Sequence, residues 1–297
     1  MTPLSGAALW LRLMLIGALW GAAFPLIRYL AAHFPPFMMA GVRGALAAVA
    51  VFVFLWFRRE LGGAGRAVLL AACVLGIFSG VVPNTLIPMA LQRMEAAPAS
   101  LVQAAGPLIV TLLAGLLLPA ERPSPRMLGG VALGFCGIAL VIGPGGFSGG
   151  TAMGALLVLG ATFSYAVSTI WVRMAPRGPA AGLALGQQAA SALISGSLAL
   201  AVDGPGALVQ PAHVWAIAVL LAIGATAVPL TLFLGLVARA RAADAAMVGY
   251  LQPVFATLIA AAWLGEVPEP RVLAGGALVL AAVGLVTARR APARSSP

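Results

Sequence analysis

Residues 75–118 read LGIFSGVVPNTLIPMALQRMEAAPASLVQAAGPLIVTLLAGLLL, and they recur in altered form 146 residues further along the chain. The second copy, residues 221–264, reads LAIGATAVPLTLFLGLVARARAADAAMVGYLQPVFATLIAAAWL and needs no gap. The matched residues include Pro83 with Pro229, Thr85 with Thr231, Arg93 with Arg239, Pro107 with Pro253, and Thr111 with Thr257. Proline, threonine and arginine that match in one register indicate a duplicated unit.

The composition of the chain indicates a polytopic membrane protein. Hydrophobic residues make up 62% of the 297 residues and charged residues only 8%. A soluble domain of this length could not bury so much apolar surface. The net charge of +10 comes from 17 basic residues, all arginine, against seven acidic ones. Because no basic run is interleaved with aromatics, arginines that fix membrane orientation explain this charge better than a nucleic-acid partner does.

Ten segments are long and apolar enough to cross a bilayer, which requires about 20 residues per helix. They are residues 8–31, 36–57, 67–91, 96–118, 127–143, 152–172, 181–202, 213–237, 243–264 and 271–288. The connections are short, and several contain Pro or Gly. The sequence therefore predicts an all-α protein with one membrane domain in two five-helix halves, residues 1–146 and 147–297.

The arginines predict that both termini are cytoplasmic. With the N-terminus inside, thirteen arginines fall in inside segments, whereas the outside loops hold only Arg28, Arg93 and Arg271, and Arg43 lies within a helix. Inside loops of membrane proteins are enriched in Arg and Lys. Since five is odd, the second half enters the membrane with the opposite polarity. Such inverted repeats are a recurrent feature of secondary transporters.

Several motifs resemble those of the EamA family of the drug/metabolite transporter superfamily. These motifs are Leu19-Trp20-Gly21-x-x-Phe24, Arg43, Pro107…Glu121…Gly129-Gly130 and Pro253…Glu266…Gly275-Gly276. Within the family, length and general pattern are most similar to the YddG-type amino-acid exporters. The resemblance implies ten helices around a central cavity that is lined mainly by helices 1, 3, 4, 6, 8 and 9.

Four paired prolines are candidate hinges: Pro83, Pro107, Pro229 and Pro253. Each removes a backbone donor and frees the carbonyl four residues earlier, which here belongs to Ser79, Gln103, Ala225 or Gly249. A freed carbonyl in lipid must face protein or a water-filled cavity. Prolines are common in transmembrane helices, but their pairing in the two halves favours a role in gating or in shaping a site.

Uncharged polar residues inside the predicted helices are the candidate substrate site. Buried amides and hydroxyls are costly in hydrocarbon, so they should face one another or a cavity. Hydrogen bonding between helices explains any one of them, but a cavity lining explains the set better. The candidates are Trp20, Asn84, Gln103, Ser164, Tyr165, Ser168, Tyr250 and Gln252.

Two single residues leave alternatives open. Trp20 lies in the middle of its helix, where it either packs between helices or forms a cavity wall. Arg43 could snorkel, bind freed carbonyls or attract a carboxylate, and we favour a structural role.

The small-residue spacings that begin at Gly17, Gly130 and Gly182 predict close helix contacts, but they do not decide between a monomer and a homodimer.

No residue pattern calls for a cofactor or a metal. Cys73 and Cys136 lie in apolar runs and are expected to act as small hydrophobes, and neither His33 nor His213 has a ligand neighbour at metal spacing. An intramembrane enzyme would need a nucleophile with a base, or paired acids at mid-depth, and neither is evident. A scaffold would not require an inverted duplication.

The absence of lysine suggests a GC-rich bacterial source, and hence the bacterial inner membrane. The sequence therefore predicts a secondary transporter that exports small neutral or zwitterionic metabolites, most readily amino acids including aromatic ones, by alternating access. An exporter of other metabolites or of drugs is the alternative. All seven acidic residues fall in loops or at helix ends, so a carrier of cations, which would be expected to hold a carboxylate at mid-depth, is disfavoured.

Overall fold

The computed structural model describes residues 6–59, 66–117, 124–143, 150–174, 180–237 and 248–287, and over these ranges every regular element is a helix. In the first half these elements are α1 (Gly6–Leu30), α2 (Pro36–Arg58), α3 (Arg66–Gly76), η1 (Ile77–Val81), α4 (Val82–Leu91), α5 (Ala96–Gln103), α6 (Gly106–Leu117) and α7 (Pro125–Ile142). The second half contains α8 (Gly150–Met174), α9 (Ala180–Val202), η4 (Pro205–Leu208), α10 (Ala212–Val219), η5 (Leu220–Ala227), α11 (Val228–Val237), α13 (Val248–Ile259), η6 (Ala260–Leu264) and α14 (Pro270–Thr287).

Eight of the continuous helical stretches within these ranges are long and apolar enough to cross a membrane. Two further apolar stretches, Val248–Leu264 and Pro270–Val286, are shorter. The predicted segment 243–264 begins among residues that lie outside the described ranges. The described helices thus support a polytopic membrane protein, and crossing by all ten segments stays a prediction.

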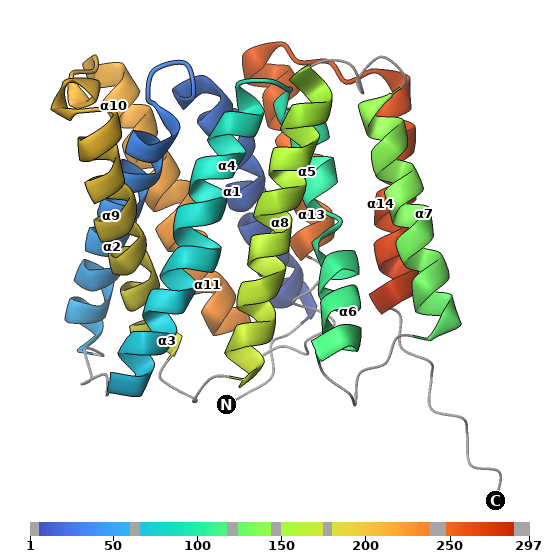
Figure 1. The fold of residues 1–297 in the computed structure, drawn as a ribbon, viewed down its shortest axis with the longest axis horizontal. Helices are drawn as coiled ribbons and strands as arrows, with labels where there is room; N and C mark the ends of the chain where they lie inside the picture. The colour runs from blue at the N-terminus through green and yellow to red at the C-terminus, as the bar shows by residue number, and fades with distance from the viewer. Residues whose placement is uncertain are drawn as a thin grey trace, which may run out of the picture.

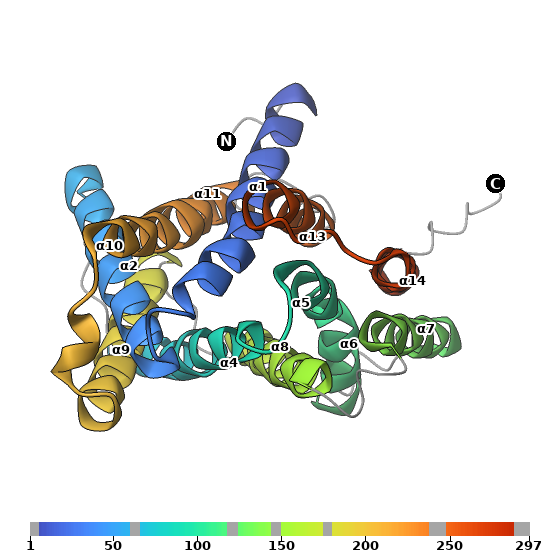
Figure 2. The same cartoon turned by 90° about the horizontal axis from the view of Figure 1, so that it is seen from above.

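The helices pack in pairs that join the two halves of the chain. Figure 2 shows α7 beside α14 at one end of the bundle and α2 beside α9 at the other, and both pairs are in close contact. Between them, α1, α11 and α13 lie on one side and α4, α5 and α8 on the other (Figure 2). The molecule therefore has a middle region that is bordered by helices from both halves.

Helix α1 begins and α14 ends at the same end of the bundle, at the bottom of Figure 1. We call this end the terminal face, and the end at which α1 ends and α14 begins the opposite face. The three arginines assigned to the outside, Arg28, Arg93 and Arg271, follow or adjoin helix ends at the opposite face. This placement agrees with the arginine pattern, and a cytoplasmic position of the terminal face stays a prediction.

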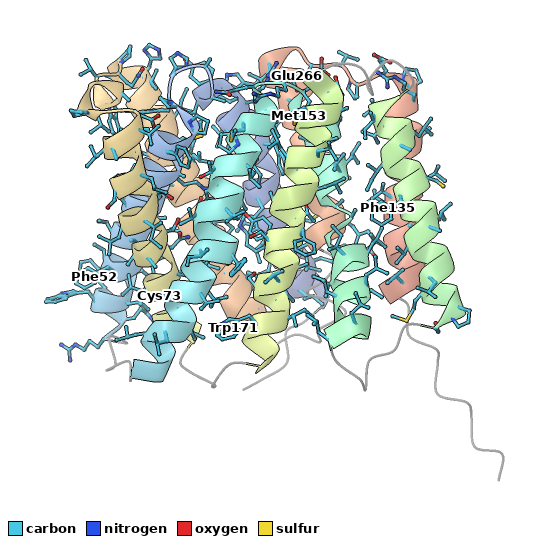
Figure 3. All side chains as sticks on the ribbon, viewed as in Figure 1. Phe52, Cys73, Phe135, Met153, Trp171 and Glu266 are labelled. Atoms are coloured by element: carbon cyan, nitrogen blue, oxygen red, sulfur yellow. The ribbon has the colours of Figure 1, made fainter. Side chains whose placement is uncertain are left out.

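Large apolar side chains cover the outside of the bundle. Phe57 is 81% exposed and Leu116 is 80% exposed, and Figure 3 shows Phe52 pointing away from the bundle. A water-soluble protein does not present so extensive an apolar surface, whereas contact with lipid tails requires one. Cys73 and Cys136 are free thiols on this exposed surface.

Two π-helical turns occur at matching positions in the halves. The turn η1 ends directly before α4, where Pro83 is the second residue, and η5 ends directly before α11, where Pro229 is the second residue. The amide of Val82 donates to the carbonyl of Ile77, and the amide of Val228 donates to that of Ile223, 146 residues on. A π turn pairs residues five apart rather than four, and such turns occur frequently at functional sites.

The π register changes which carbonyl Pro83 leaves free. Five residues before Pro83 stands Phe78, and its carbonyl accepts a hydrogen bond from Ser164 Oγ at 2.6 Å. The four-residue register had predicted the carbonyl of Ser79 instead. The expected break at Pro107 appears as the division between α5 and α6, whereas Pro253 lies inside the continuous helix α13.

Small residues bring helices into close contact, as their spacing predicts. A Cβ on Gly21 would lie 2.7 Å from the carbonyl oxygen of Gln252, and one on Gly137 would lie 2.8 Å from that of Gly275. Both distances are shorter than a van der Waals contact. The pairs α1–α13 and α7–α14 therefore depend on residues without side chains at their crossing points.

Candidate functional site

A cavity of about 440 Å³ lies in the middle region of the bundle. The helices that line it are α1, α2, α4, α5, α8, α9, α11 and α13, together with the π turns η1 and η5. Residues at matching positions in the two halves face it, namely Asn84 with Leu230 and Ile87 with Phe233. The duplicated stretches thus contribute equivalent walls to one cavity.

Six of the eight residues proposed from sequence line this cavity: Trp20, Asn84, Gln103, Tyr165, Ser168 and Gln252. The other two do not belong to its lining. Ser164 instead bonds the carbonyl of Phe78, and Tyr250 packs against the hydrophobic core. Whether the six bind a substrate stays a prediction.

Six polar lining residues were not among the eight sequence candidates: Arg43, Ser79, Thr169, Gln187, Gln188 and Thr226. The two adjacent glutamines in the apolar segment 181–202 could have been noticed, because amides are as costly there as Gln103 is in its helix. Thr226 carries no such signal, since a threonine in a transmembrane helix commonly bonds its own backbone.

The guanidinium of Arg43 is held in the cavity by a neutral partner. Its Nε donates to Thr226 Oγ1 at 2.9 Å, and that hydroxyl donates to the carbonyl of Leu221 at 2.9 Å within the π turn η5. In the first half, Ser79 Oγ donates to the carbonyl of Leu75, the residue that matches Leu221. The hydrogen bond that the structure gives Arg43 is therefore to a hydroxyl, whereas a carbonyl freed by a proline was one of the partners considered for it.

The hydrogen bonds of the lining are incomplete at one point. The side-chain oxygen of Gln103, Oε1, is buried and has no hydrogen-bond partner in the structure. Gln103 is the last residue of α5, directly before the division from α6. A buried acceptor without a donor is costly, so this atom has the capacity to bind an N–H or O–H group from a ligand.

Two aromatic rings of the cavity wall lie side by side. Trp20 and Phe233 lie with ring centroids 5.1 Å apart and planes tilted by 54°. Below them, a small apolar cluster of Leu13, Ile16, Leu236 and Val248 joins α1, α11 and α13. Trp20 thus both packs between helices and forms a cavity wall, so the two alternatives for this residue are compatible.

Comparison with known proteins decides the family. The profile of the EamA-like transporter family matches this chain twice, over residues 8–143 and 152–288. The chain belongs to the EamA-like transporter family.

The chain is also similar to named relatives and to a solved fold. It is 29% identical over 289 residues to the "Uncharacterized inner membrane transporter YedA" of Escherichia coli K12. The aligned region covers 96% of this chain and 90% of that protein. The protein of the same name from Escherichia coli O157:H7 matches equally. One crystal structure aligns with a TM-score of 0.65 at 22% identity, over 95% of this chain and 97% of the other, which shows the fold alone.

At the opposite face, this EamA transporter joins four helix ends through Glu266. Glu266 accepts a hydrogen bond from the amide of Ala96 at 2.8 Å, and its carboxylate lies 3.4 Å from Arg28 Nε. Arg28 in turn donates to the carbonyl of Leu91. We call these four residues the Glu266 contact group; Figure 3 shows Glu266 at this face. They connect the ends of α1 and α4, the start of α5 and the segment after η6.

The surroundings of Glu266 shift the pKa of its carboxyl group. Partial burial raises the pKa of Glu266, while the Ala96 amide opposes the rise, the nearby Glu95 adds to it and Arg28 opposes it. Helix packing also connects these ends: α5 contacts α1 and α13 as well as α7, α8 and α14, on which α6 packs too. Helix packing and a charged contact therefore hold the start of α5 against the end of α1, and we call this joined arrangement of the helix ends closed.

Proposed function

We propose that this membrane transporter exports small neutral or zwitterionic metabolites, amino acids including aromatic ones, across the bacterial inner membrane. The observation that carries the proposal is the character of the cavity. Its polar lining consists of amides, hydroxyls and Arg43, and among the described lining residues none is acidic. Such a lining suits a solute whose own charges cancel, because carbonyl oxygens accept from an ammonium group and N–H or O–H groups donate to a carboxylate.

The proposed mechanism is alternating access by two inverted five-helix repeats, residues 1–146 and 147–297, with all ten segments crossing the bilayer and both termini cytoplasmic. Pro83, Pro107, Pro229 and Pro253 serve as hinges in this mechanism, since they adjoin the π turns, the α5–α6 division and the middle of α13. Export of amino acids is also what the resemblance to YddG-type exporters implies.

Transport by the purified protein in liposomes tests the proposal. We expect uptake of several labelled neutral amino acids without an imposed proton or sodium gradient. Ala23→Trp should abolish uptake by filling the cavity, since Ala23 lines it. The matched control Ala132→Trp adds the same ring on the exposed side of α7 and should transport normally. Selective uptake of organic cations or phosphate esters, with neutral amino acids ignored, would contradict the proposal.

A further inference from the structure

The cavity contains a cation without an acidic partner. Arg43 projects from α2 into the bundle, and its Nε donates to the hydroxyl of Thr226. None of the described residues that line the cavity is an aspartate or glutamate. A guanidinium away from bulk water is expensive unless it is paired, and such residues inside membrane proteins usually mark a ligand path. The cavity therefore presents a positive charge that no described lining carboxylate balances.

The geometry of a guanidinium limits what can match that charge. It carries five N–H donors in a planar fork that fits a carboxylate with two parallel hydrogen bonds. Thr226 occupies Nε. Because Thr226 is fixed by its own bond to the carbonyl of Leu221, the guanidinium is oriented by the π turn η5. The orientation that the guanidinium presents to a ligand is thus set by the helix from the other half of the chain.

A second lining residue has an unsatisfied atom of the complementary kind. Gln103 Oε1 is a buried acceptor without a donor, and Gln103 lines the cavity from α5. An amino group on the ligand would supply the missing donor. The lining therefore contains one group that can bind an anion, on α2, and one residue whose side-chain acceptor is unsatisfied, on α5.

We propose that Arg43 binds the carboxylate of the solute, so that a carboxylate is required for entry into this cavity, and that Gln103 accepts a hydrogen bond from its amino group. The inference rests on the proposed function, since it names the chemical feature by which that same site selects its substrate. Thr226 is a positioning residue that acts through Arg43. The rest of the cavity, walled by apolar and aromatic groups such as Phe24 and Phe233, tolerates side chains of different sizes.

Binding to the purified wild-type protein in detergent tests this inference without requiring transport. The panel holds L-phenylalanine, L-phenylalaninamide, phenethylamine and 3-phenylpropionate, with the leucine and alanine acids and amides alongside. We expect amino acids to raise the thermal unfolding temperature most and 3-phenylpropionate to raise it less. The amides and the amine, which lack a carboxylate, should have no effect. Equal stabilisation by acids and amides, or none by any carboxylate, would overturn the inference.

Variants of Arg43 separate ligand binding from a structural role. Arg43→Met should weaken amino-acid binding by about 10- to 100-fold, the cost of a lost charge-assisted hydrogen bond, while Arg43→Lys should retain part of it. Arg43→Met should also erase the preference for acids over amides, which a purely structural role would not do. Arg59→Met, at the exposed end of the same helix, is the control and should bind normally.

Thr226→Val provides a milder second test in case Arg43→Met does not fold. It keeps the guanidinium but removes its orienting hydroxyl, so we expect weaker binding of acids and an unchanged lack of binding of amides. Unaltered affinity for acids in Thr226→Val would show that Thr226 does not position Arg43.

If acids bind but no solute is transported, the proposed function fails and the carboxylate site stands. If amides are transported as well as acids, the transporter stands and the carboxylate site fails.

Discussion

The hydroxyl of Ser164 illustrates how a single residue compensates for a proline in another helix. Pro83 removes an amide donor, the π turn transfers the loss to the carbonyl of Phe78, and Ser164 Oγ restores the bond at 2.6 Å from α8. In the membrane no water is at hand to replace it. This residue, which the sequence marked as a site candidate, is better explained as the link between α8 and η1.

We therefore expect Ser164→Ala to destabilise the protein by about 1–3 kcal/mol, the cost of a buried acceptor without a donor. Ser168→Ala is a matched control one helical turn away, because the hydroxyl of Ser168 bonds the carbonyl of Tyr165 in its own helix. Thermal unfolding of both variants in detergent provides the measurement. Equal stability of the two variants would show that the carbonyl of Phe78 is satisfied without Ser164.

The cavity residues differ in how far the sequence could assign them, and the reason is physical. Six candidates line the cavity because an amide, hydroxyl or indole within an apolar helix is costly unless it faces a cavity or a polar partner. For Arg43 the sequence left three roles open, since a long cation can reach a helix end, a backbone carbonyl or a ligand. Only the position of Thr226, on a helix 183 residues away, shows which way the guanidinium turns.

At the scale of helices, the crossing of α7 and α14 depends on two reciprocal glycines. A Cβ on Gly137 would lie 2.8 Å from the oxygen of Gly275, and one on Gly275 would lie 2.7 Å from that of Gly137. Gly137→Val should thus separate the helices and destabilise the protein by about 1–3 kcal/mol, as overpacking does. A Cβ on Gly129, in the same helix, meets nothing within 4 Å. Gly129→Val should hence unfold at the wild-type temperature, and a similar loss in both variants would contradict the packing argument.

Proton binding at Glu266 should bias the four helix ends at the opposite face. Burial raises its pKa above the ordinary value of 4.5 in this closed arrangement. When the ends separate, the carboxyl returns to water and to its ordinary pKa. Protons then bind more strongly to the closed arrangement, so linkage requires acidification to favour closure. The stabilisation of the closed arrangement is fully present at pH values below the ordinary pKa of Glu266. It is lost as the pH rises through the raised pKa.

Spin labels on Arg93→Cys and Val267→Cys, in a protein without Cys73 and Cys136, can measure this closure. Both positions are exposed at the opposite face. We expect the population of short label distances to grow as the pH falls from neutral toward the ordinary pKa of the carboxyl. Glu266→Gln keeps an acceptor for the Ala96 amide but does not titrate, so its distances should be independent of pH in this range. Opening on acidification would refute the linkage.

Helix ranges were the most predictable feature of the elements. Residues 36–57 became Pro36–Arg58 and residues 271–288 became Pro270–Thr287, because apolar runs end where charges, Pro or Gly begin. The division of other segments by π turns was not predicted. A π turn needs the same apolar residues as an α-helix, and it is selected by the partners that its carbonyls find, such as Ser164 and Val82.

At the scale of the whole molecule, matching residues lie at opposite ends of the bundle. Arg59 follows α2 at the terminal face, and Pro205, 146 residues later, begins η4 after α9 at the opposite face (Figure 1). The connections at Phe147 and Arg177, which an inverted repeat would place on opposite sides of the membrane, lie outside the described residues. Arg59 and Pro205 are described residues and provide a matched pair.

Single cysteines at Arg59 and Pro205, in a protein without its two native cysteines, should label from different sides of the membrane. Arginine-rich loops remain cytoplasmic, and the terminal face carries Arg12, Arg58 and Arg59 within the described residues, so we expect Arg59→Cys to be inside. In spheroplasts, a membrane-impermeant maleimide should then label Pro205→Cys directly and Arg59→Cys only after permeabilisation. Labelling of both from one side would refute the inverted repeat. Labelling of Arg59→Cys alone from outside would keep the repeat but reverse the orientation, and with it the side from which Glu266 receives its protons.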